Sequence, residues 1–199
     1  AFGYFNVHKD TDSALRAFNN ARLQSPHDAR LLFEYDQLLK RTKCSPAERL
    51  ALLQKSPALV QQRDDVTVEM ASLLNSEGSP HTALALLLSR QFRPWEGGEG
   101  AVLAQYMRSL TLLAVQYLRQ NNPAEAIACL HRAQMPPASL AEARHVLSNT
   151  SIVDFWLGTA YREAGDTATA KHHFETSAAA HGDFQQMQVQ EISEATYWS

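Results

Sequence analysis

The residues with the most distinctive chemistry stand in one Gly- and Pro-containing stretch, from Arg93 to Gly100. Trp95 offers an aromatic face there, and Glu96 and Glu99 add two carboxylates. This combination can hold a sugar, and it can equally anchor the loop on a neighbouring protein surface through a buried Trp. Two carboxylates alone do not make a glycosidase, because the pair must flank a bond at a defined separation. We therefore expect a loop that packs or binds.

Histidines are the next residues that could do chemistry. His172 and His173 are adjacent, and neighbouring residues on a helix point about 100° apart, so the two rings cannot readily share one metal. His131, His145 and His181 are isolated in the sequence, and we expect all five of these histidines to be surface side chains. The chain has no H-E-x-x-H, no G-x-S-x-G, no phosphate loop and no dinucleotide-binding glycine motif. We expect no enzyme, no catalytic residue, no metal and no cofactor.

Charge and composition exclude several further classes. The net charge is −3 and Lys and Arg are scattered along the 199 residues, which disfavours a nucleic-acid surface. The chain contains no apolar run close to the ~20 residues that cross a bilayer, so no membrane partner is expected. Cys44 and Cys129 are the only cysteines, and their isolation favours free, reduced thiols. We expect a cytoplasmic protein, and the abrupt start at Ala1 is typical of a cut fragment.

The elements that must position these residues are paired helices. In the clearest unit, from Ser151 to about Phe184, Gly158 and Ala170 are small enough to let two antiparallel helices approach. Leu157, Tyr161 and Phe174 can then fill the space around that contact. The turn between the two helices contains Gly165, which can take the positive φ that ends a helix.

The same spacing recurs upstream. The unit from Met107 to Leu140 carries Ala114, Tyr117, Ala126 and Leu130 at the matching positions, and the unit from Asp64 to Gly97 carries Ala71, Leu74, Ala83 and Leu87. The N-terminal third is less regular: it indicates a partial repeat at 1–27 and an irregular one at 28–62, whose second helix starts at Ser45-Pro46. Residues 190–199 resemble the start of a further helix.

These matches resemble the tetratricopeptide-repeat (TPR) consensus over roughly residues 10–199. The resemblance implies an all-α fold, a TPR-type right-handed superhelix of antiparallel helix pairs, with approximate repeats at 64–97, 107–140 and 151–184. The starts of successive repeats lie 43 and 44 residues apart, against about 34 for a plain TPR. We therefore expect two loop insertions, one near Trp95 and one around Pro136 to Ser148, and such insertions are often functional.

A narrower resemblance rests on two stretches, Phe33 to Leu38 and Ser45 to Leu50, and above all on Ser89 to Gly100. These are similar to large uncharacterised bacterial proteins in which a β-rich domain of the galactose-mutarotase type precedes a TPR tail. Arg93 departs from that pattern, in which His is expected. The resemblance implies that this chain is the tail of a larger, carbohydrate-related bacterial protein.

The concave groove expected of a TPR array is mixed in character here. TPR domains that clamp a C-terminal carboxylate carry Lys and Asn on the first helix of each repeat, whereas Arg108 is the single cation at the equivalent positions of this sequence. A carboxylate clamp is therefore not expected. Arg108, Phe155 and Arg162 are our candidates for contacts in the groove, with solvated or packing roles as the alternative.

The leading functional hypothesis is a non-catalytic scaffold that binds a protein, a peptide or another domain of the same chain through the groove and the Trp95 loop. The alternative is a TPR tail that contributes the loop, with Trp95, Glu96 and Glu99, to a carbohydrate-binding or carbohydrate-processing site formed with an upstream domain. A third reading is a homo-oligomer, because exposed repeat ends can stack on one another.

Overall fold

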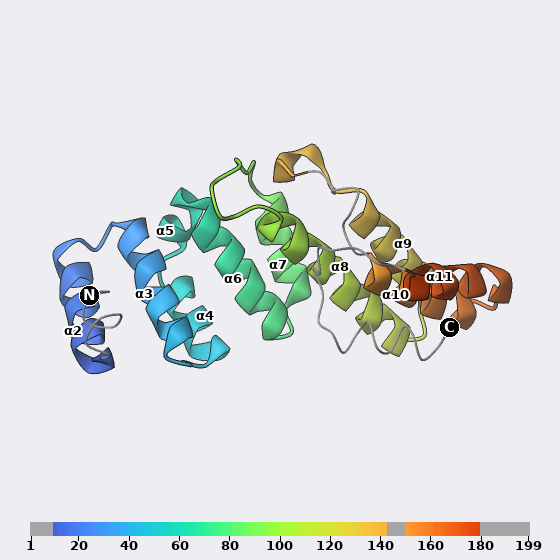
Figure 1. Ribbon diagram of the computed structural model, residues 1–199, viewed down its shortest axis with the longest axis horizontal. Helices are drawn as coiled ribbons and strands as arrows, with labels where there is room; N and C mark the ends of the chain where they lie inside the picture. Colours follow the sequence, from blue (N-terminus) through green and yellow to red (C-terminus); the bar gives the residue numbers. More distant parts are fainter. Residues whose placement is uncertain (1–9, 143–149, 180–199) are drawn as a thin grey trace. The chain divides into compact units, whose positions relative to one another are not determined.

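The computed structural model describes residues 10–142 and 150–179, and these form helices joined by turns and loops (Figure 1). The chain divides into two compact units, Ala1–Ser79 (unit 1) and Pro80–Ser199 (unit 2), which we describe separately. The expectations for residues 1–7 and 190–199, for His145 and His181, and for the end of the second insertion lie outside the described residues. The division into repeats within one solenoid stays a prediction.

Unit 1 contains five described helices. Their bounds are α2 Thr11–Gln24, α3 Ala29–Arg41, α4 Pro46–Gln54, α5 Pro57–Gln62 and α6 Asp64–Ser76. The side chain of Asp10 caps α2 and that of Asp28 caps α3, each by accepting backbone N–H groups of the first turn. The start predicted for α4 is confirmed, because Ser45 and Glu48 form a reciprocal capping box around Pro46.

The core of unit 1 begins where α2 packs on α3. Ala14 and Phe18 of α2 and Leu38 of α3 are buried together, and Tyr35 lies against them. The helices α4 and α5 then pack on both α3 and α6. The end of the irregular repeat predicted at 28–62 is the short helix α5, in which Leu59 is buried.

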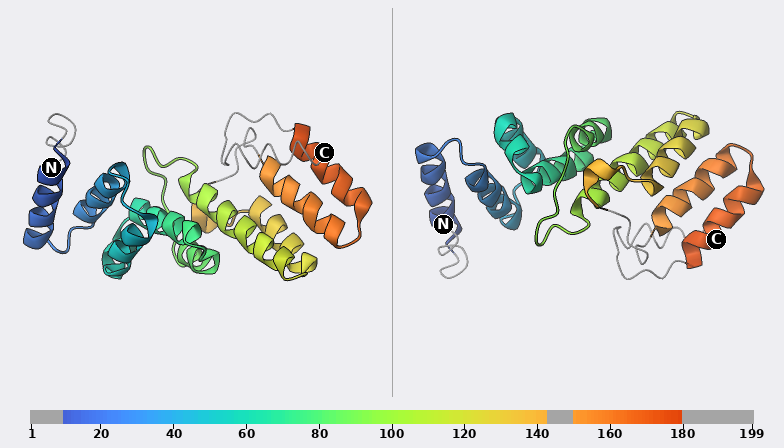
Figure 2. Two further views of the ribbon diagram at one scale, coloured as in Figure 1. Left: turned by 90° about the horizontal axis from the view of Figure 1, so that it is seen from below. Right: turned by 90° about the horizontal axis from the view of Figure 1, so that it is seen from above.

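Unit 2 consists of α7 Pro80–Leu88, α8 Ala101–Arg119, α9 Pro123–Gln134, the 3₁₀ turn η1 Ala138–Leu140, α10 Ser151–Glu163 and α11 Thr167–Ala179. The helices α8 and α9 form one pair and α10 and α11 another, and α9 packs on α10 (Figure 2). The helix α8 begins at Ala101, earlier than the predicted start at Met107. Its added turns follow the loop that contains Trp95.

The predicted close contact within the last helix pair is confirmed. A Cβ built on Gly158 of α10 would lie 2.7 Å from ring carbons of Phe174 of α11, so only glycine allows the ring to sit there. Gly165, in the turn between these helices, has a φ of +85°, as predicted from its place at the helix end. The helix-pair architecture read from the sequence is thus built as expected in this part of the chain.

Candidate interaction surfaces

The Trp95 loop, residues 89–100, joins α7 to α8. Its indole packs directly over Gly98, where a built Cβ would lie only 1.9 Å from Cε2 of Trp95. The Gly98 N–H donates to the Trp95 carbonyl oxygen at 3.1 Å, which closes the turn beneath the ring. Trp95 is half-buried, whereas Glu96 and Glu99 are exposed. The loop therefore presents two carboxylates beside a tryptophan that is partly held by its own backbone.

The two predicted insertions meet in space. The N–H of Phe92, in the first, donates to the carbonyl oxygen of Ser139, in the second, at 2.8 Å. Phe92 is 2% exposed and Leu140 is 0% exposed, so each insertion also places a large apolar side chain in the core. The sequence indicated two separate loops, and the structure makes them one substructure.

Glu142 joins these insertions a second time, at the start of α8. One carboxylate oxygen accepts the N–H of Gly100 at 3.1 Å and the other accepts the N–H of Leu103 at 2.8 Å. A helix leaves its first N–H groups without partners, and a carboxylate there is favoured by the helix dipole. Burial nevertheless raises the pKa of Glu142, with the exposed Glu99 adding repulsion, and the two N–H donors oppose that rise.

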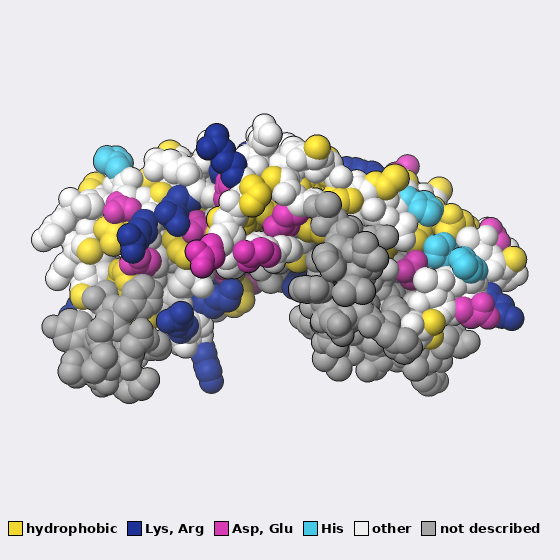
Figure 3. All heavy atoms as spheres, turned by 45° about the horizontal axis from the view of Figure 1, so that its top comes forward, with side chains coloured by type: hydrophobic (Ala, Val, Ile, Leu, Met, Phe, Trp, Pro, Cys, Tyr) yellow, Lys and Arg dark blue, Asp and Glu magenta, His cyan; other side chains and the backbone are white. Residues whose placement is uncertain are grey.

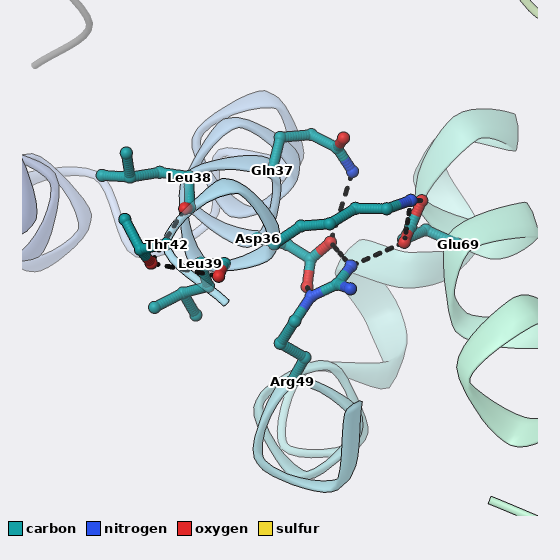
Figure 4. A network of polar contacts seen from close by, with 8 residues as sticks. Asp36, Gln37, Leu38, Leu39, Thr42, Arg49 and Glu69 are labelled. Carbon is teal, nitrogen blue, oxygen red and sulfur yellow. Dashed lines mark hydrogen bonds and ion pairs between the residues drawn. The ribbon is translucent and has the colours of Figure 1, made fainter. Parts of the chain in front are cut away.

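Unit 1 contains a buried charge network that sequence reasoning missed (Figure 4). Arg49 of α4 donates from Nε to Asp36 Oδ1 at 3.0 Å and from Nη2 to Asp36 Oδ2 at 2.6 Å. The same Nη2 lies 2.6 Å from Glu69 Oε1 of α6, and Lys40 Nζ donates to both oxygens of Glu69. Three helices are thus joined through one guanidinium.

The electrostatics of this network follow from burial. Burial raises the pKa of Asp36 more than the hydrogen bond and charge of Arg49 lower it. Burial also opposes ionisation of Glu69, but the hydrogen bonds and charges of Arg49 and Lys40 outweigh it and lower the pKa of Glu69. In the sequence, this network is signalled by Asp36, which lies among the apolar residues of 29–41. A buried carboxylate requires a cationic partner, so its position indicates an ion pair.

A second polar chain links the last three helices of unit 2. The Nδ1 atom of His173 lies 3.1 Å from Oδ1 of Asp154, which is 5% exposed, and the ring of His173 stacks on Tyr161 at 5.6 Å between centroids. The hydroxyl of Tyr161 lies 3.1 Å from Nε2 of His131 on α9. Histidines gather on this face over α9–α11 (Figure 3).

The expectation that the histidines are simple surface residues is therefore wrong for two of them. His131 and His173 are half-buried and have specific partners, whereas the adjacent His172 is exposed. Spacing along one helix could not predict these contacts, because each partner comes from a different helix. Among the described residues, no group of three or more His, Cys, Asp or Glu side chains is placed to hold a metal ion.

Residues 153–182 match the family model of the tetratricopeptide repeat. The match covers all of α11 and all but the first two residues of α10, the pair built around Gly158 and Phe174.

Two solved structures resemble the chain over nearly its full length. A crystal structure of MamA protein has a TM-score of 0.55 at 14% identity, with 98% of this chain and 90% of that chain covered. A crystal structure of MamA has a TM-score of 0.56 at 15% identity, with 98% and 95% covered. At these identities the likeness shows the fold alone, and the all-α TPR-type fold predicted from the sequence is confirmed.

Within the TPR pair, the predicted groove residues divide between core and surface. Phe155 is 5% exposed and its ring lies 6.0 Å from that of Phe174, so it belongs to the core of the pair. The Arg162 guanidinium carbon lies 5.8 Å from the Phe174 ring centroid, with the residue itself exposed. Arg108 is exposed on α8. Of the predicted site residues, Phe155 and Arg162 thus lie against the same ring, that of Phe174. Trp95, Glu96 and Glu99 lie together in the loop 89–100.

The remaining expectations concern thiols and membranes. Cys44 and Cys129 are both free, the first half-buried and the second buried, and burial raises the pKa of each thiol. Among the described residues, none of the helices combines the length and apolar character that a membrane span requires. An open hollow of about 660 Å³ in unit 1 was not predicted; it is lined by residues 24–30 with Gln62 and Arg63.

Proposed function

We propose that this chain is a non-catalytic TPR scaffold that binds a protein partner, with the Trp95 loop as its principal contact. The observation that carries the proposal is the construction of the loop: its two exposed carboxylates and its half-buried tryptophan project from a base anchored in the core by Phe92. A tryptophan that is already positioned loses little rotamer freedom on binding, which favours its use as an anchor.

The mixed charge of the surface favours an ordinary protein partner over a strongly charged polymer such as a nucleic acid. Lys, Arg, Asp and Glu are interspersed on the face shown in Figure 3. Arg108 and Arg162, exposed on the first helices of successive TPR units, are proposed as secondary contacts. The partner is a separate cytoplasmic protein or another domain of a larger bacterial polypeptide of which this chain is the TPR tail.

A site-specific photo-crosslinker tests the proposal. With p-benzoylphenylalanine in place of the exposed Glu96, we expect a defined crosslinked protein in cells that produce the chain. The same amino acid in place of exposed Glu77, in unit 1, is the matched control and should not crosslink that protein. The purified crosslinked protein is then titrated calorimetrically against the unmodified chain.

Two variants decide whether the predicted contacts carry the affinity. Trp95→Ala is expected to weaken binding about 30-fold or more, the size of a hot-spot loss. Arg108→Ala is expected to weaken it by less than about tenfold, because an exposed charge contributes little by itself. Far-UV circular dichroism should be the same for both variants. Binding that is unchanged by Trp95→Ala would contradict the proposal.

A further inference from the structure

We propose that the segment from Pro136 to Glu142, which we call the brace, fixes the conformation in which the Trp95 loop is presented. Glu142 is the residue that couples the two segments. For its consequence on partner binding, this inference rests on the function proposed above. The coupling itself is independent of any partner.

The brace holds both ends of the loop. At the first end, the Phe92 N–H donates to the Ser139 carbonyl oxygen at 2.8 Å. At the second end, the Gly100 N–H donates to the Glu142 carboxylate at 3.1 Å, and the Leu103 N–H anchors the other oxygen at 2.8 Å. Residues 93–99 therefore span a gap whose two sides are set by one short segment.

The brace itself is firmly placed. Leu140 is 0% exposed, and the 3₁₀ turn that contains it packs on α7. Ala141 then adopts a φ of +56°, a left-handed conformation that a residue with a Cβ rarely takes unless its surroundings impose it. Ala141 follows the buried Leu140 directly, and its conformation places the next residue, Glu142, against the first turn of α8.

Two backbone hydrogen bonds connect Trp95 to the Gly100 end of the loop: the Gly98 N–H donates to the Trp95 carbonyl oxygen at 3.1 Å, and the Ala101 N–H donates to the Gly98 carbonyl oxygen at 3.0 Å. The Gly97 N–H donates to Glu99 Oε1 at 3.3 Å, a long hydrogen bond between two exposed residues. The Trp95 indole also packs on Gly98. Because Gly98 contacts the ring and its carbonyl oxygen accepts the Ala101 N–H beside the Gly100 anchor, release of the Gly100 end is expected to change the position of the Trp95 ring.

The test follows Trp95 directly by ¹⁹F NMR of protein labelled with 5-fluorotryptophan, with its resonance assigned by Trp95→Phe. In Glu142→Ala we expect this resonance to shift and broaden while that of Trp156 is unchanged. Amide exchange at Gly100 and Leu103 should accelerate about tenfold, because both N–H groups lose their acceptor. Glu125→Ala, which removes an exposed carboxylate of the same unit, should change neither the Trp95 resonance nor the exchange rates of the Gly100 and Leu103 amides.

A shorter carboxylate keeps the test informative if Glu142→Ala fails to fold. In Glu142→Asp one methylene is lost, so the carboxylate cannot reach both amides, and we expect an intermediate shift of the Trp95 resonance. An unchanged Trp95 resonance in a folded variant whose Gly100 and Leu103 amides exchange faster would overturn the coupling. Unchanged exchange would overturn the role of Glu142 altogether.

The partner identified by crosslinking separates this inference from the proposed function. Trp95→Ala tests whether the loop is the contact, and the fluorine measurement tests the brace whatever that result is. If Trp95→Ala weakens binding, Glu142→Ala should weaken it as well, by a smaller factor, because the ring remains present in a wider set of positions. Full affinity in Glu142→Ala, together with a displaced Trp95 resonance, would refute control of binding by the brace.

Discussion

Arg49 and Asp36 form a two-bond ion pair in the interior of unit 1, with side chains that are 6% and 1% exposed. Removal of Asp36 leaves Arg49 charged in a poorly solvated position, with one of its two carboxylate partners gone and Glu69 retained. We therefore expect Asp36→Ala to lower the free energy of unfolding by about 3–5 kcal/mol, the usual cost of breaking a buried pair. Urea denaturation at neutral pH, followed by circular dichroism, measures this loss.

An exposed pair in the same helix is the matched control. Arg30 and Glu34 form an i,i+4 bridge of 2.8 Å, with side chains that are 74% and 24% exposed and so far better solvated than the Arg49–Asp36 pair. Glu34→Ala should cost no more than about 0.5 kcal/mol, because solvent screens exposed pairs. Equal losses in the free energy of unfolding for Asp36→Ala and Glu34→Ala would show that burial does not strengthen the contribution of the Arg49–Asp36 pair to stability.

Glu69 is expected to make unit 1 sensitive to acid. Arg49 and Lys40 lower the pKa of Glu69 in the folded protein despite its burial. A carboxylate with a lowered folded pKa contributes stability that is fully present above its unfolded value of about 4.3 and is lost as pH falls through the folded value. The destabilisation caused by Glu69→Gln, measured by urea denaturation, should therefore be largest at neutral pH and shrink below about pH 4.

Its control is Glu77→Gln, which changes an exposed carboxylate at the end of the same helix. The free-energy difference between this variant and the parent should be small at every pH, since exposed carboxylates contribute little. A Glu69→Gln effect that stays constant from pH 7 to pH 3 would mean that the ionised form of Glu69 is not the stabilising one.

The contact between Gly158 and Phe174 predicts an unusual response to alanine. In a helix interior Gly→Ala ordinarily stabilises by about 1 kcal/mol, but here the added Cβ would lie 2.7 Å from the ring. Overpacking of a core costs about 1–3 kcal/mol, so we expect Gly158→Ala to be destabilising. In the background of Phe174→Leu, which opens space at the ring edge, the same change should cost less or become stabilising. Thermal and urea unfolding of the four proteins decide this.

Those parts of the fold that depend on local chemistry could be predicted from the sequence. Gly158 and Phe174 belong to one repeat and approach each other through a short turn, so their spacing specifies their contact. Ser45 and Glu48 likewise specify the start of α4 within four consecutive residues. In such cases the partners are near in sequence, and a known helix geometry fixes their separation.

The candidate site could be predicted only in part, because its supports come from distant segments. Trp95 stood out by residue type, but Glu142, which caps α8 from 42 positions beyond Gly100, carries no local signal. Phe155 was placed in the groove by its repeat position, whereas packing against Phe174 buries it. Pairing between helices depends on the angles at which they pack, and periodicity does not supply those angles.

The hydrogen bond between His173 and Asp154 gives a further prediction. His173→Phe should keep the stacking on Tyr161 but remove the imidazole from the buried Asp154 carboxylate, which retains the hydrogen bond from the Thr150 hydroxyl. The loss of a donor to a buried charged group costs about 1–3 kcal/mol. His172→Phe, at an exposed neighbouring position, is expected to change the stability little. Similar urea midpoints for the two variants would contradict a structural role for the His173–Asp154 contact.

Gly97 and Gly98 are neighbours that should respond in different ways to alanine. A Cβ on Gly98 would lie 1.9 Å from the Trp95 indole, so Gly98→Ala must displace the ring. A Cβ on Gly97 meets nothing within 4 Å, but the φ of +78° strains any other residue there by about 1–2 kcal/mol. In proteins that retain Trp95 as their single tryptophan, we expect red-shifted emission and stronger acrylamide quenching for Gly98→Ala. Gly97→Ala should lower the loop's stability with a much smaller change in emission, and equal spectra for the two variants would refute the packing of Trp95 on Gly98.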